Sequence, residues 1–487
     1  MATRGRQPQS NRRLQPNRQN RSRRISETPQ TWNAYPGGAS GNGAHGRPSR
    51  QPVFPRWAYI LAGVLLAFAV IYGLFTFVSS CTSQEAAQPP AEASSSSVAP
   101  AGEGEAEPED AAAEPAALPG TRVSFVAVGD NVPNDVLAEY ADAQAGEVGD
   151  GVYDYKPLFA HVKPLVQEAD LSYIDQEVHI GGAEIGPAGY PSFNTTDEMA
   201  DAVVDCEFDL VASASNHAYD WGAFGAVEHS RAVWNEQPVA FTGTATSEEE
   251  AAEIPVVERN GIRFALLNYT YGVNGYTQED IPRYAVNFID EDRIREDVAR
   301  AREQADVVLA AMHWGTENET EPDAQERQWA QLLADLGVDV VLGSHPHVTQ
   351  PLTWLTGADG NRTLVAYSLG NFIIQHADPT PYNDLEGMLA CDFVKYADGE
   401  EPPADAADHD AASGYTNAAG ITIERVRWIP LVYHGVEGEY AVWPLADYTA
   451  EQAARNPAYA STSDPLEWLR TNAAAIVNAE GNDFQVG

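Results

Sequence analysis

The sequence predicts an α/β domain over residues 121–487, and two features of the chain support this prediction. Residues 123–128 form an almost unbroken apolar run of strand length that ends at a Gly-Asp pair, and similar runs recur along the chain. Segments with helical periodicity separate several of these runs. Strands that are apolar on both faces and alternate with helices are typical of layered α/β domains.

The remaining elements follow in chain order. The other predicted strands are short, apolar and rich in branched residues, and they are 171–174, 210–213, 263–268, 307–312, 338–342 and 363–367. The predicted helices carry apolar residues three and four positions apart, and they are 157–168, 196–206, 221–235, 292–304 and 326–336. After residue 387 the pattern changes to strands around a polar insertion at 398–415, with further strands at 420–428 and 440–442. We therefore expect a β-rich portion, 387–487, to complete the domain.

The formal net charge of −42 divides unevenly along the 487 residues. Residues 1–56 contain eleven arginines and one glutamate, whereas no lysine or arginine lies between residue 57 and Arg122. An overall charge this negative argues against nucleic acid as a partner, because neutralising phosphates requires clustered lysine and arginine. The three cysteines are too few for a disulfide framework.

Residues 57–78 form an uncharged apolar segment of 22 residues, which is long enough as a helix to span a hydrocarbon core of roughly 30 Å. The arginines precede this segment and none follows it closely, so the positive-inside rule predicts a cytoplasmic N-terminus and an extracellular domain. We therefore expect a single-pass protein of the cell membrane. The flanking segments are poor in large apolar residues and are predicted to be a disordered cytoplasmic tail (1–56) and a disordered acidic stalk (79–120).

The cysteines leave two alternatives open. The segment from Val78 to Cys81 resembles a lipobox, in which an aliphatic and two small residues precede a cysteine. Cys81 is therefore either a lipid-attachment site or an unmodified cysteine next to the membrane. Cys206 and Cys391 are either a disulfide pair outside the cell or buried free thiols.

Side chains with metal-binding chemistry follow five of the predicted strands. They are Asp130, then Asp175 and Glu177, then Asn216, His217 and Asp220, then His313 and Glu317, and finally His345 and His347. Because an α/β sheet places its ligand site at the carboxyl ends of its strands, we expect these side chains to converge. Carboxylate, amide and imidazole groups without cysteine favour divalent ions of the Mn, Fe or Zn type. The number of ligands predicts two such ions bridged by a carboxylate, a centre suited to displacement at phosphorus.

These motifs also carry a family resemblance. The GD of Asp130, ASNHAYDWG, HWGTE, GSHPHVTQP and SLGNF occur in the order typical of the CapA family of capsule and poly-γ-glutamate synthesis proteins. The resemblance covers residues 123–373. Since the CapA family is itself similar to the calcineurin-like metallophosphoesterases, the resemblance implies a four-layer α-β-β-α sandwich, two β-sheets between helices, with a dimetal centre at the strand ends.

The resemblance also implies a role for each metal-binding candidate. Asp130 and His347 would bind the first ion, and Asn216, His313 and His345 would bind the second. The bridging carboxylate would come from residues 175–177. The family usually has Asn-Leu-Glu there and this chain has Asp-Gln-Glu, so either Asp175 or Glu177 is the bridge.

The catalytic candidates are His217 and Asp220. The resemblance implies that His217 is a general acid or a stabiliser of charge in the transition state. Asp220 either orients His217 or caps the helix that follows it, and Glu317 either supports His313 or is a solvated loop residue. The wider phosphoesterases have a histidine where this chain has Val132, a departure that weakens the expected first metal site.

Two functions fit this sequence. The first is a membrane-anchored, extracytoplasmic, metal-dependent phosphoesterase of capsule or poly-γ-glutamate synthesis. The alternative is a non-catalytic, polymer-handling component of capsule assembly that retains the fold. In both cases the expected partners are the cell membrane and the capsule or poly-γ-glutamate assembly machinery. The acidic domain would repel a polyanion, which disfavours direct binding of polyglutamate.

Overall fold

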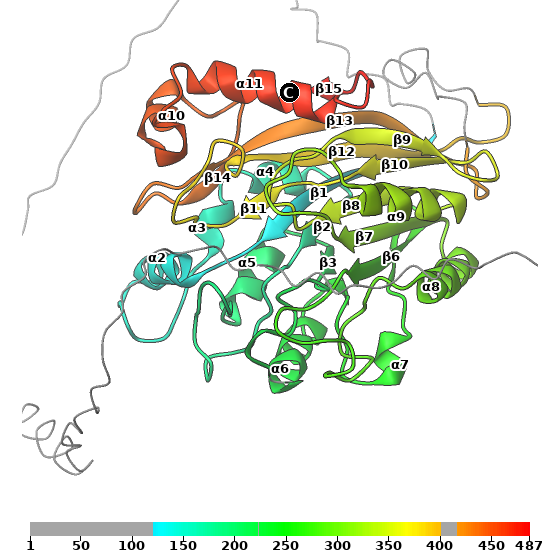
Figure 1. Cartoon of the computed structure of the whole chain (residues 1–487). Helices are drawn as coiled ribbons and strands as arrows, with labels where there is room; N and C mark the ends of the chain where they lie inside the picture. The colour runs from blue at the N-terminus through cyan, green and yellow to red at the C-terminus, as the bar shows by residue number, and fades with distance from the viewer. Residues whose placement is uncertain (1–119, 223, 401–415) are drawn as a thin grey trace, which may run out of the picture. The chain divides into compact units, whose positions relative to one another are not determined.

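The structure is a computed structural model that describes residues 120–222, 224–400 and 416–487. Two β-sheets pack face to face in this part of the chain, and helices cover the outer face of each sheet (Figure 1). The predicted α/β class is therefore confirmed. The predicted membrane span at 57–78 and the tail lie outside the described residues, as does the stalk except for Gly120. Among the helices that the structure describes, none has both the length and the apolar character needed to cross a bilayer.

The first sheet is mixed, in the order β14-β13-β12-β1-β2-β3-β4, with β11 beside β1 and β15 beside β13. Its strands are β1 (Thr121–Asn131), β2 (Leu171–Asp175), β3 (Leu210–Ala212), β4 (Ala240–Thr242), β11 (Asn371–Ile373), β12 (Leu385–Lys395), β13 (Ile421–His434), β14 (Ala441–Pro444) and β15 (Gln485–Val486). Strands β1 to β4 are parallel, so their carboxyl ends meet at one edge. Strands β12 to β14 extend the sheet by antiparallel pairing.

The second sheet has the order β5-β6-β7-β8-β10-β9. Its strands are β5 (Val256–Arg259), β6 (Ile262–Thr270), β7 (Val307–His313), β8 (Val340–Ser344), β9 (Leu352–Thr356) and β10 (Arg362–Ala366). The four central strands are parallel, and the two edge strands pair antiparallel. His313 pairs with Thr270 on one side and Ser344 on the other, so the carboxyl ends of β6, β7 and β8 lie in register.

Alternation along β1 explains why its sequence is apolar throughout. Val123, Phe125 and Ala127 face the second sheet, whereas Val126 and Val128 face the helices on the other side. Both sets are almost fully buried. A strand between a second sheet and a helical layer has no solvent-exposed face, and this is the arrangement that an unbroken apolar run favours.

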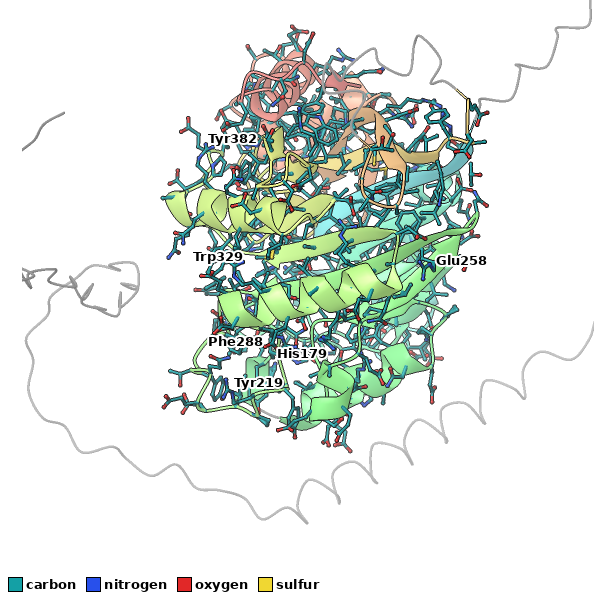
Figure 2. All side chains as sticks on the ribbon, turned by 90° about the vertical axis from the view of Figure 1, so that its right-hand side faces the viewer. His179, Tyr219, Glu258, Phe288, Trp329 and Tyr382 are labelled. Atoms are coloured by element: carbon teal, nitrogen blue, oxygen red, sulfur yellow. The ribbon has the colours of Figure 1, made fainter. Side chains whose placement is uncertain are left out.

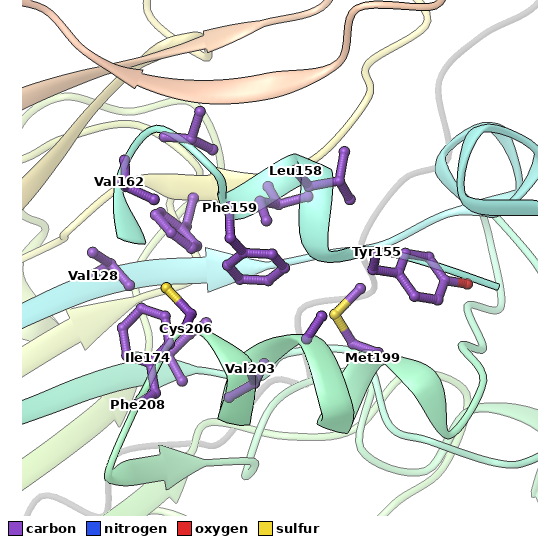
Figure 3. Close-up of a cluster of buried hydrophobic side chains, with 14 of the residues drawn as sticks. Val128, Tyr155, Leu158, Phe159, Val162, Ile174, Met199, Val203, Cys206 and Phe208 are labelled. Atoms are coloured by element: carbon purple, nitrogen blue, oxygen red, sulfur yellow. The ribbon is translucent and has the colours of Figure 1, made fainter. Parts of the chain in front are cut away.

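The helices over the first sheet enclose a cluster of buried side chains (Figure 3). They are α2 (Asp135–Ala145), α3 (Lys156–Phe159), α4 (Lys163–Gln167), α5 (Glu198–Asp205) and α6 (Phe224–Asn235). The single helix predicted at 157–168 is wrong, because the chain forms the two short helices α3 and α4 there. The reason is Pro164, which lacks the N–H that a continuous helix would need and instead lies in the first turn of α4.

The outer face of the second sheet is covered by α8 (Glu291–Gln304) and α9 (Ala324–Asp335), with α7 (Glu248–Ala251) before them (Figure 2). Both long helices begin at an aspartate whose side chain accepts hydrogen bonds from the first turn. In α9 this aspartate, Asp323, forms a capping box with Glu326. Such caps satisfy donors that a helix leaves unpaired, and they fix where each helix begins.

The carboxyl-terminal portion differs from the β-rich segment that the sequence predicted. Strands β12, β13 and β14 complete the first sheet, but residues 450–477 then form α10 (Ala450–Arg455), the 3₁₀ helix η2 (Pro457–Tyr459) and α11 (Pro465–Val477). Alanine is frequent in α10 and α11, and alanine has the highest helix propensity of all residues. Of the two predicted cysteine alternatives, Cys206 and Cys391 are buried free thiols.

Candidate metal centre

All nine predicted site residues come together where the carboxyl ends of the two sheets meet. In the first sheet, Asp130 of β1 pairs with Asp175 of β2 on one side and Asn371 of β11 on the other. In the second sheet, His313 ends β7, and His345 follows β8 directly. The structure therefore brings together the five strand ends at which the sequence placed these side chains.

Close backbone approach at Gly129 shapes this edge of the first sheet. A Cβ atom at residue 129 would lie 1.9 Å from the carbonyl oxygen of Gly370. Only glycine therefore allows β1 to pass so near the segment before β11. The Asp130 N–H donates a 3.0 Å hydrogen bond to that same oxygen, which fixes the position of the Asp130 side chain.

Glu177 lies at the middle of the cluster. Its Oε1 atom is 3.8 Å from His347 Nε2, 3.9 Å from His217 Nε2 and 4.0 Å from His313 Nε2. Three groups of side chains in the described residues are close enough to hold a metal ion: Asp130, Asp175, Glu177 and His313; Glu177, His313 and His345; and Glu317, His345 and His347. Glu177, His313 and His345 each belong to two of these groups, whereas Asp175 belongs to one, so the geometry favours Glu177 over Asp175 as a bridging carboxylate.

Asn216 and His313 approach each other from different sheets. Asn216 Oδ1 lies 2.8 Å from His313 Nε2, and the opposite ring nitrogen of His313 lies 3.0 Å from Ser344 Oγ. Two ligands of one ion that bind at about 2.1 Å, at right angles to each other, are about 3 Å apart. This pair is therefore spaced as two ligands of the same ion would be.

His345 and His347 both have left-handed backbones, with φ values of 94° and 58°. This conformation is strained for residues other than glycine, and such strain concentrates at functional sites. It turns the GSHPH segment so that the His345 N–H donates to Asp130, at 3.2 Å from Oδ2. His347 Nδ1 lies 2.9 Å from Asn371 Oδ1 and 3.0 Å from Asp130 Oδ2, so its Nε2 faces Glu177.

The carboxylates of this cluster are buried without enough hydrogen-bond donors. Asp175 and Glu177 are almost fully buried, and none of their carboxylate oxygens has a hydrogen-bond partner among the described residues. The same holds for Nδ1 of His345. A buried carboxylate without a partner is costly unless a cation neutralises it. The cluster therefore fits a divalent cation, and its oxygen and imidazole donors suit ions of the Mn, Fe or Zn type.

The pKa shifts point to the same need for positive charge. Burial raises the pKa of Asp175 to about 7 and that of Glu177 well above its usual range. Burial lowers the pKa of His313 to about 3 and that of His345 well below normal, so both imidazoles are neutral, as metal ligation requires. Burial also lowers the pKa of His347, but the charges of Glu177 and Asp130 outweigh this effect and raise it to about 10.

His217 and Asp220 form a hydrogen-bonded pair beside the cluster. His217 Nδ1 lies 2.7 Å from Asp220 Oδ2, and the same carboxylate oxygen accepts a 2.7 Å hydrogen bond from the Phe193 N–H. Helix α6 begins only at Phe224, after the 3₁₀ turn η1 (Asp220–Gly222). Of the two predicted roles for Asp220, the structure therefore supports the orientation of His217.

Val132 occupies the position where the wider phosphoesterases have a histidine. It is buried and packs against Val178, Phe193 and Ile374. Its N–H donates to the carbonyl of Ile373. This position is part of a small apolar cluster, so it contributes no ligand to the centre.

Two residues near the centre, Tyr271 and His179, were not identified from the sequence, and a third, Glu317, was predicted only as a support for His313 or a solvated loop residue. Glu317 joins His345 and His347 in one of the possible metal groups. The ring of Tyr271 lies over His345, with ring centroids 4.7 Å apart. His179 is buried with Nδ1 3.0 Å from the carbonyl of His217. These contacts depend on loop conformations, and only the HWGTE motif contained a signal, since Glu317 lies four residues after His313.

The described part of the chain is thus an α/β protein of two packed sheets whose strand ends gather side chains that could hold metal ions. The profile of the bacterial capsule synthesis protein family PGA_cap matches residues 124–376. This match covers more than half of the chain, and the chain therefore belongs to this family, that of the CapA proteins. The resemblance read from the motifs is confirmed.

Two curated relatives carry capsule-related names. The PGA biosynthesis protein CapA of Bacillus subtilis (strain 168) is 26% identical over 251 residues, which are 49% of this chain and 60% of that protein. The capsule biosynthesis protein CapA of Bacillus anthracis is 26% identical over 222 residues, 44% of this chain and 49% of that protein. The chain thus spans about half to three-fifths of the length of these relatives.

Among solved structures, a hypothetical protein from Thermus thermophilus is similar over 58% of this chain and 96% of that chain. The sequence identity is 17% and the TM-score is 0.33. A similarity this low supports no functional inference, so the function has to be inferred from the site itself.

Proposed function

We propose that this protein is a membrane-anchored, extracytoplasmic CapA-type protein of capsule or poly-γ-glutamate synthesis that hydrolyses a phosphoester at a centre of two divalent metal ions. The observation that carries the proposal is the convergence of buried carboxylates without hydrogen-bond partners and three histidines at five strand ends. The two sheets packed between helices are also what a metallophosphoesterase-like fold would have. The capsule role is taken from the names of the relatives.

The ligands would divide between two ions around Glu177. Asp130, Asp175 and His347 would hold the first ion, and Asn216, His313 and His345 the second, with Glu177 between them and Glu317 as a further donor. When bound, the ions supply Lewis-acid stabilisation of the phosphoryl oxygens and activation of a water molecule. The side chains of this cluster bring the required negative charge, which makes the binding of divalent cations favourable.

His217 supplies the proton chemistry. Asp220 accepts the hydrogen bond of Nδ1 at 2.7 Å, and this contact orients the imidazole. The other ring nitrogen, Nε2, faces the centre at 3.9 Å from Glu177. His217 can therefore donate a proton from Nε2 to the leaving oxygen of a bound phosphoester, while Phe193, edge-on to its ring at 4.7 Å, limits its movement.

The test combines metal content with turnover. We expect about two divalent ions per chain, with phosphodiesterase or phosphomonoesterase activity that falls roughly 100-fold or more in His217→Ala. His229→Ala is a matched control, because His229 is a surface histidine that pairs with Asp197 away from the centre. Metal-loaded protein that turns over no phosphoester faster than His217→Ala would contradict the proposal and favour the polymer-handling alternative.

A further inference from the structure

Exposed aromatic side chains gather in the loops around the metal centre. In the described part of the chain, five tyrosine or tryptophan side chains are exposed, and four of them come from these loops: Tyr190 (87% exposed), Trp221 (49%), Tyr271 (45%) and Tyr276 (39%). The fifth, Tyr382, packs against Trp468 of α11. We call the first four the aromatic rim. Large aromatic side chains left in solvent beside a polar cluster are typical of ligand-binding sites.

Tyr271 links the aromatic rim to the predicted metal ligands. Its ring lies nearly parallel to that of His313, with 6.4 Å between centroids, and 4.7 Å from that of His345. Its N–H donates a 3.0 Å hydrogen bond to the His313 carbonyl. Almost half of the side chain is nevertheless exposed, so Tyr271 forms the boundary between the centre and solvent.

Trp221 and Tyr276 come from two loops that contact each other. The Asn274 N–H donates a 2.8 Å hydrogen bond to the Asn216 carbonyl. The Tyr276 hydroxyl occupies the space that a Cβ of Gly222 would need, 1.7 Å from that position. A small apolar cluster under both loops, which includes Val273 and Ile281, supports them. These contacts hold the loops of Trp221 and Tyr276 against each other.

Trp221 has a left-handed backbone with φ of 71°. It directly follows Asp220, the partner of His217. Tryptophan in this conformation is strained, and strain of this kind persists at sites where it serves function. On the other side of His217, Tyr190 packs on Phe193 at 6.5 Å, and Phe193 packs on the His217 ring at 4.7 Å. A row of aromatic side chains therefore extends from solvent at Tyr190 to the proposed proton donor.

We propose that the aromatic rim is a subsite for a ring carried by the alcohol part of the phosphoester, such as a sugar or a nucleobase. This inference rests on the proposed phosphoesterase function and names its substrate class. Aromatic faces gain from stacking on a flat ring or on the C–H face of a sugar, whereas the metal centre would hold the phosphate. An open-chain polyanion offers no such face, so the rim disfavours polyglutamate as the substrate.

The test uses phosphonates, which cannot be hydrolysed, and measures binding to the Mn²⁺-loaded protein by calorimetry. We expect phenylphosphonate to bind about tenfold more tightly than methylphosphonate. Trp221→Leu and Tyr271→Leu should each reduce this preference to about twofold or less. Tyr271→Phe retains the ring and should keep the preference, and so should Tyr382→Leu, which removes an exposed aromatic side chain outside the rim.

The outcomes separate the two proposals. If neither phosphonate binds to metal-loaded protein, the proposed function is wrong. If both bind equally, and Trp221→Leu and Tyr271→Leu change nothing, the aromatic subsite is wrong and the phosphoesterase proposal stands. Competition in the His217→Ala protein then identifies the ring: adenosine monophosphate or glucose 6-phosphate should displace phenylphosphonate at lower concentration than the ringless glycerol 3-phosphate. Equal displacement by all three would also overturn the subsite.

Discussion

Glu177 is the residue on which the centre depends most, because its Oε1 lies within 4.0 Å of nitrogens of three histidines. Removing its charge while keeping its shape, as in Glu177→Gln, should lower Mn²⁺ or Zn²⁺ affinity at least tenfold. The measurement is bound metal per chain by mass spectrometry after dialysis at fixed free metal concentration.

Glu317→Gln is the matched comparison for this prediction, because Glu317 belongs only to the outer group with His345 and His347 and is exposed. We expect it to lose less metal than Glu177→Gln. Equal losses in both variants would contradict the central position assigned to Glu177.

Asp384, which directly precedes β12, is another buried carboxylate, and we expect it to affect the free energy of unfolding. Burial raises its pKa to about 8, although a hydrogen bond from Asn456 opposes this effect. In the unfolded chain its pKa is about 3.9. Between these values the folded state binds a proton that the unfolded state does not, so this group destabilises the fold increasingly as the pH rises from about 4 to 8.

Asp384→Asn removes this titration and keeps an acceptor for Asn456. We expect the variant to gain roughly 2–4 kcal/mol of unfolding free energy relative to wild type on going from pH 5 to pH 8. Denaturant unfolding at both pH values checks this. A difference between variant and wild type that does not change with pH would show that Asp384 is ionised in the folded protein.

For individual residues, the sequence predicted which side chains belong to the site better than it predicted which contacts they make. His217 and Asp220 are three positions apart, so their pairing could be anticipated from the chain, and the structure shows the hydrogen bond between them. The position of Tyr271, and the grouping of Glu317 with His345 and His347, could not be anticipated, because both depend on backbone conformations of loops that local propensity does not determine.

Among the elements, β3 and β6 set the position of Asn216 and His217. Asn268 of β6, in the second sheet, is buried, and its Oδ1 accepts hydrogen bonds from the N–H groups of Ser213 (2.9 Å) and Ala214 (2.6 Å) after β3 of the first sheet. The side-chain amide of Asn268 thus links the end of β3 in the first sheet to β6 in the second.

Asn268→Ala would leave both N–H groups buried without acceptors. We expect a loss of about 2 kcal/mol or more in unfolding free energy, together with weaker metal binding, because Asn216 would lose its support. Asn268→Asp is the control that retains the acceptor oxygen, and it should be less damaged in metal affinity. Thermal unfolding and metal titration of both variants give the answer; equal metal affinity in Asn268→Ala and wild type would count against this role.

The strand positions were predicted well and the helix boundaries less well. Short apolar runs favour strands that are covered on both faces, and the seven strands predicted before residue 387 fall within a few residues of β1, β2, β3, β6, β7, β8 and β10. Strands β4, β5, β9 and β11 were not predicted. The predicted helix at 221–235 begins later, at Phe224, because Trp221 takes a left-handed backbone in the turn that precedes α6. That conformation is set by packing around Asp220 and Tyr276 and has no local sequence signal.

For the whole molecule, metal binding should be coupled to stability. The centre draws its ligands from both sheets, so an ion bound there stabilises the folded state selectively. At a free ion concentration 100 times the dissociation constant, the gain is about 2.7 kcal/mol per ion. We expect Mn²⁺ to raise the melting temperature by about 5 °C over protein treated with chelator, and Glu177→Gln to reduce this shift by more than half. A shift of the same size in that variant would place the stabilising ion elsewhere.

A further prediction concerns membrane attachment by the amino-terminal part of the chain. Full-length protein should sediment with membranes and resist extraction by high salt, because residues 57–78 are long and apolar enough to span the bilayer. External protease should cut the acidic domain away from intact cells if the predicted orientation is correct. A variant that lacks residues 57–78 is the control and should be soluble.

Mass spectrometry decides between the alternatives at Cys81. A recovered unmodified peptide that spans residues 77–84 shows an intact span and excludes lipid attachment after cleavage. A mature chain whose first residue is a lipidated Cys81 shows that the preceding segment is cleaved off and that Cys81 is the lipid-attachment site.

The sequence by itself determined the α/β class, most of the central strands, the membership of the CapA family and the set of metal-binding candidates, because apolar periodicity and motif spacing are local properties of the chain. Only the tertiary structure decided that Glu177 lies among three histidines, that Asp220 is hydrogen-bonded to His217, and that Tyr271 lies against His313 and His345. Each of these depends on contacts between residues far apart in sequence or on strained loop backbones. Packing of the two sheets fixes these contacts and loop conformations, and no local sequence pattern predicts them.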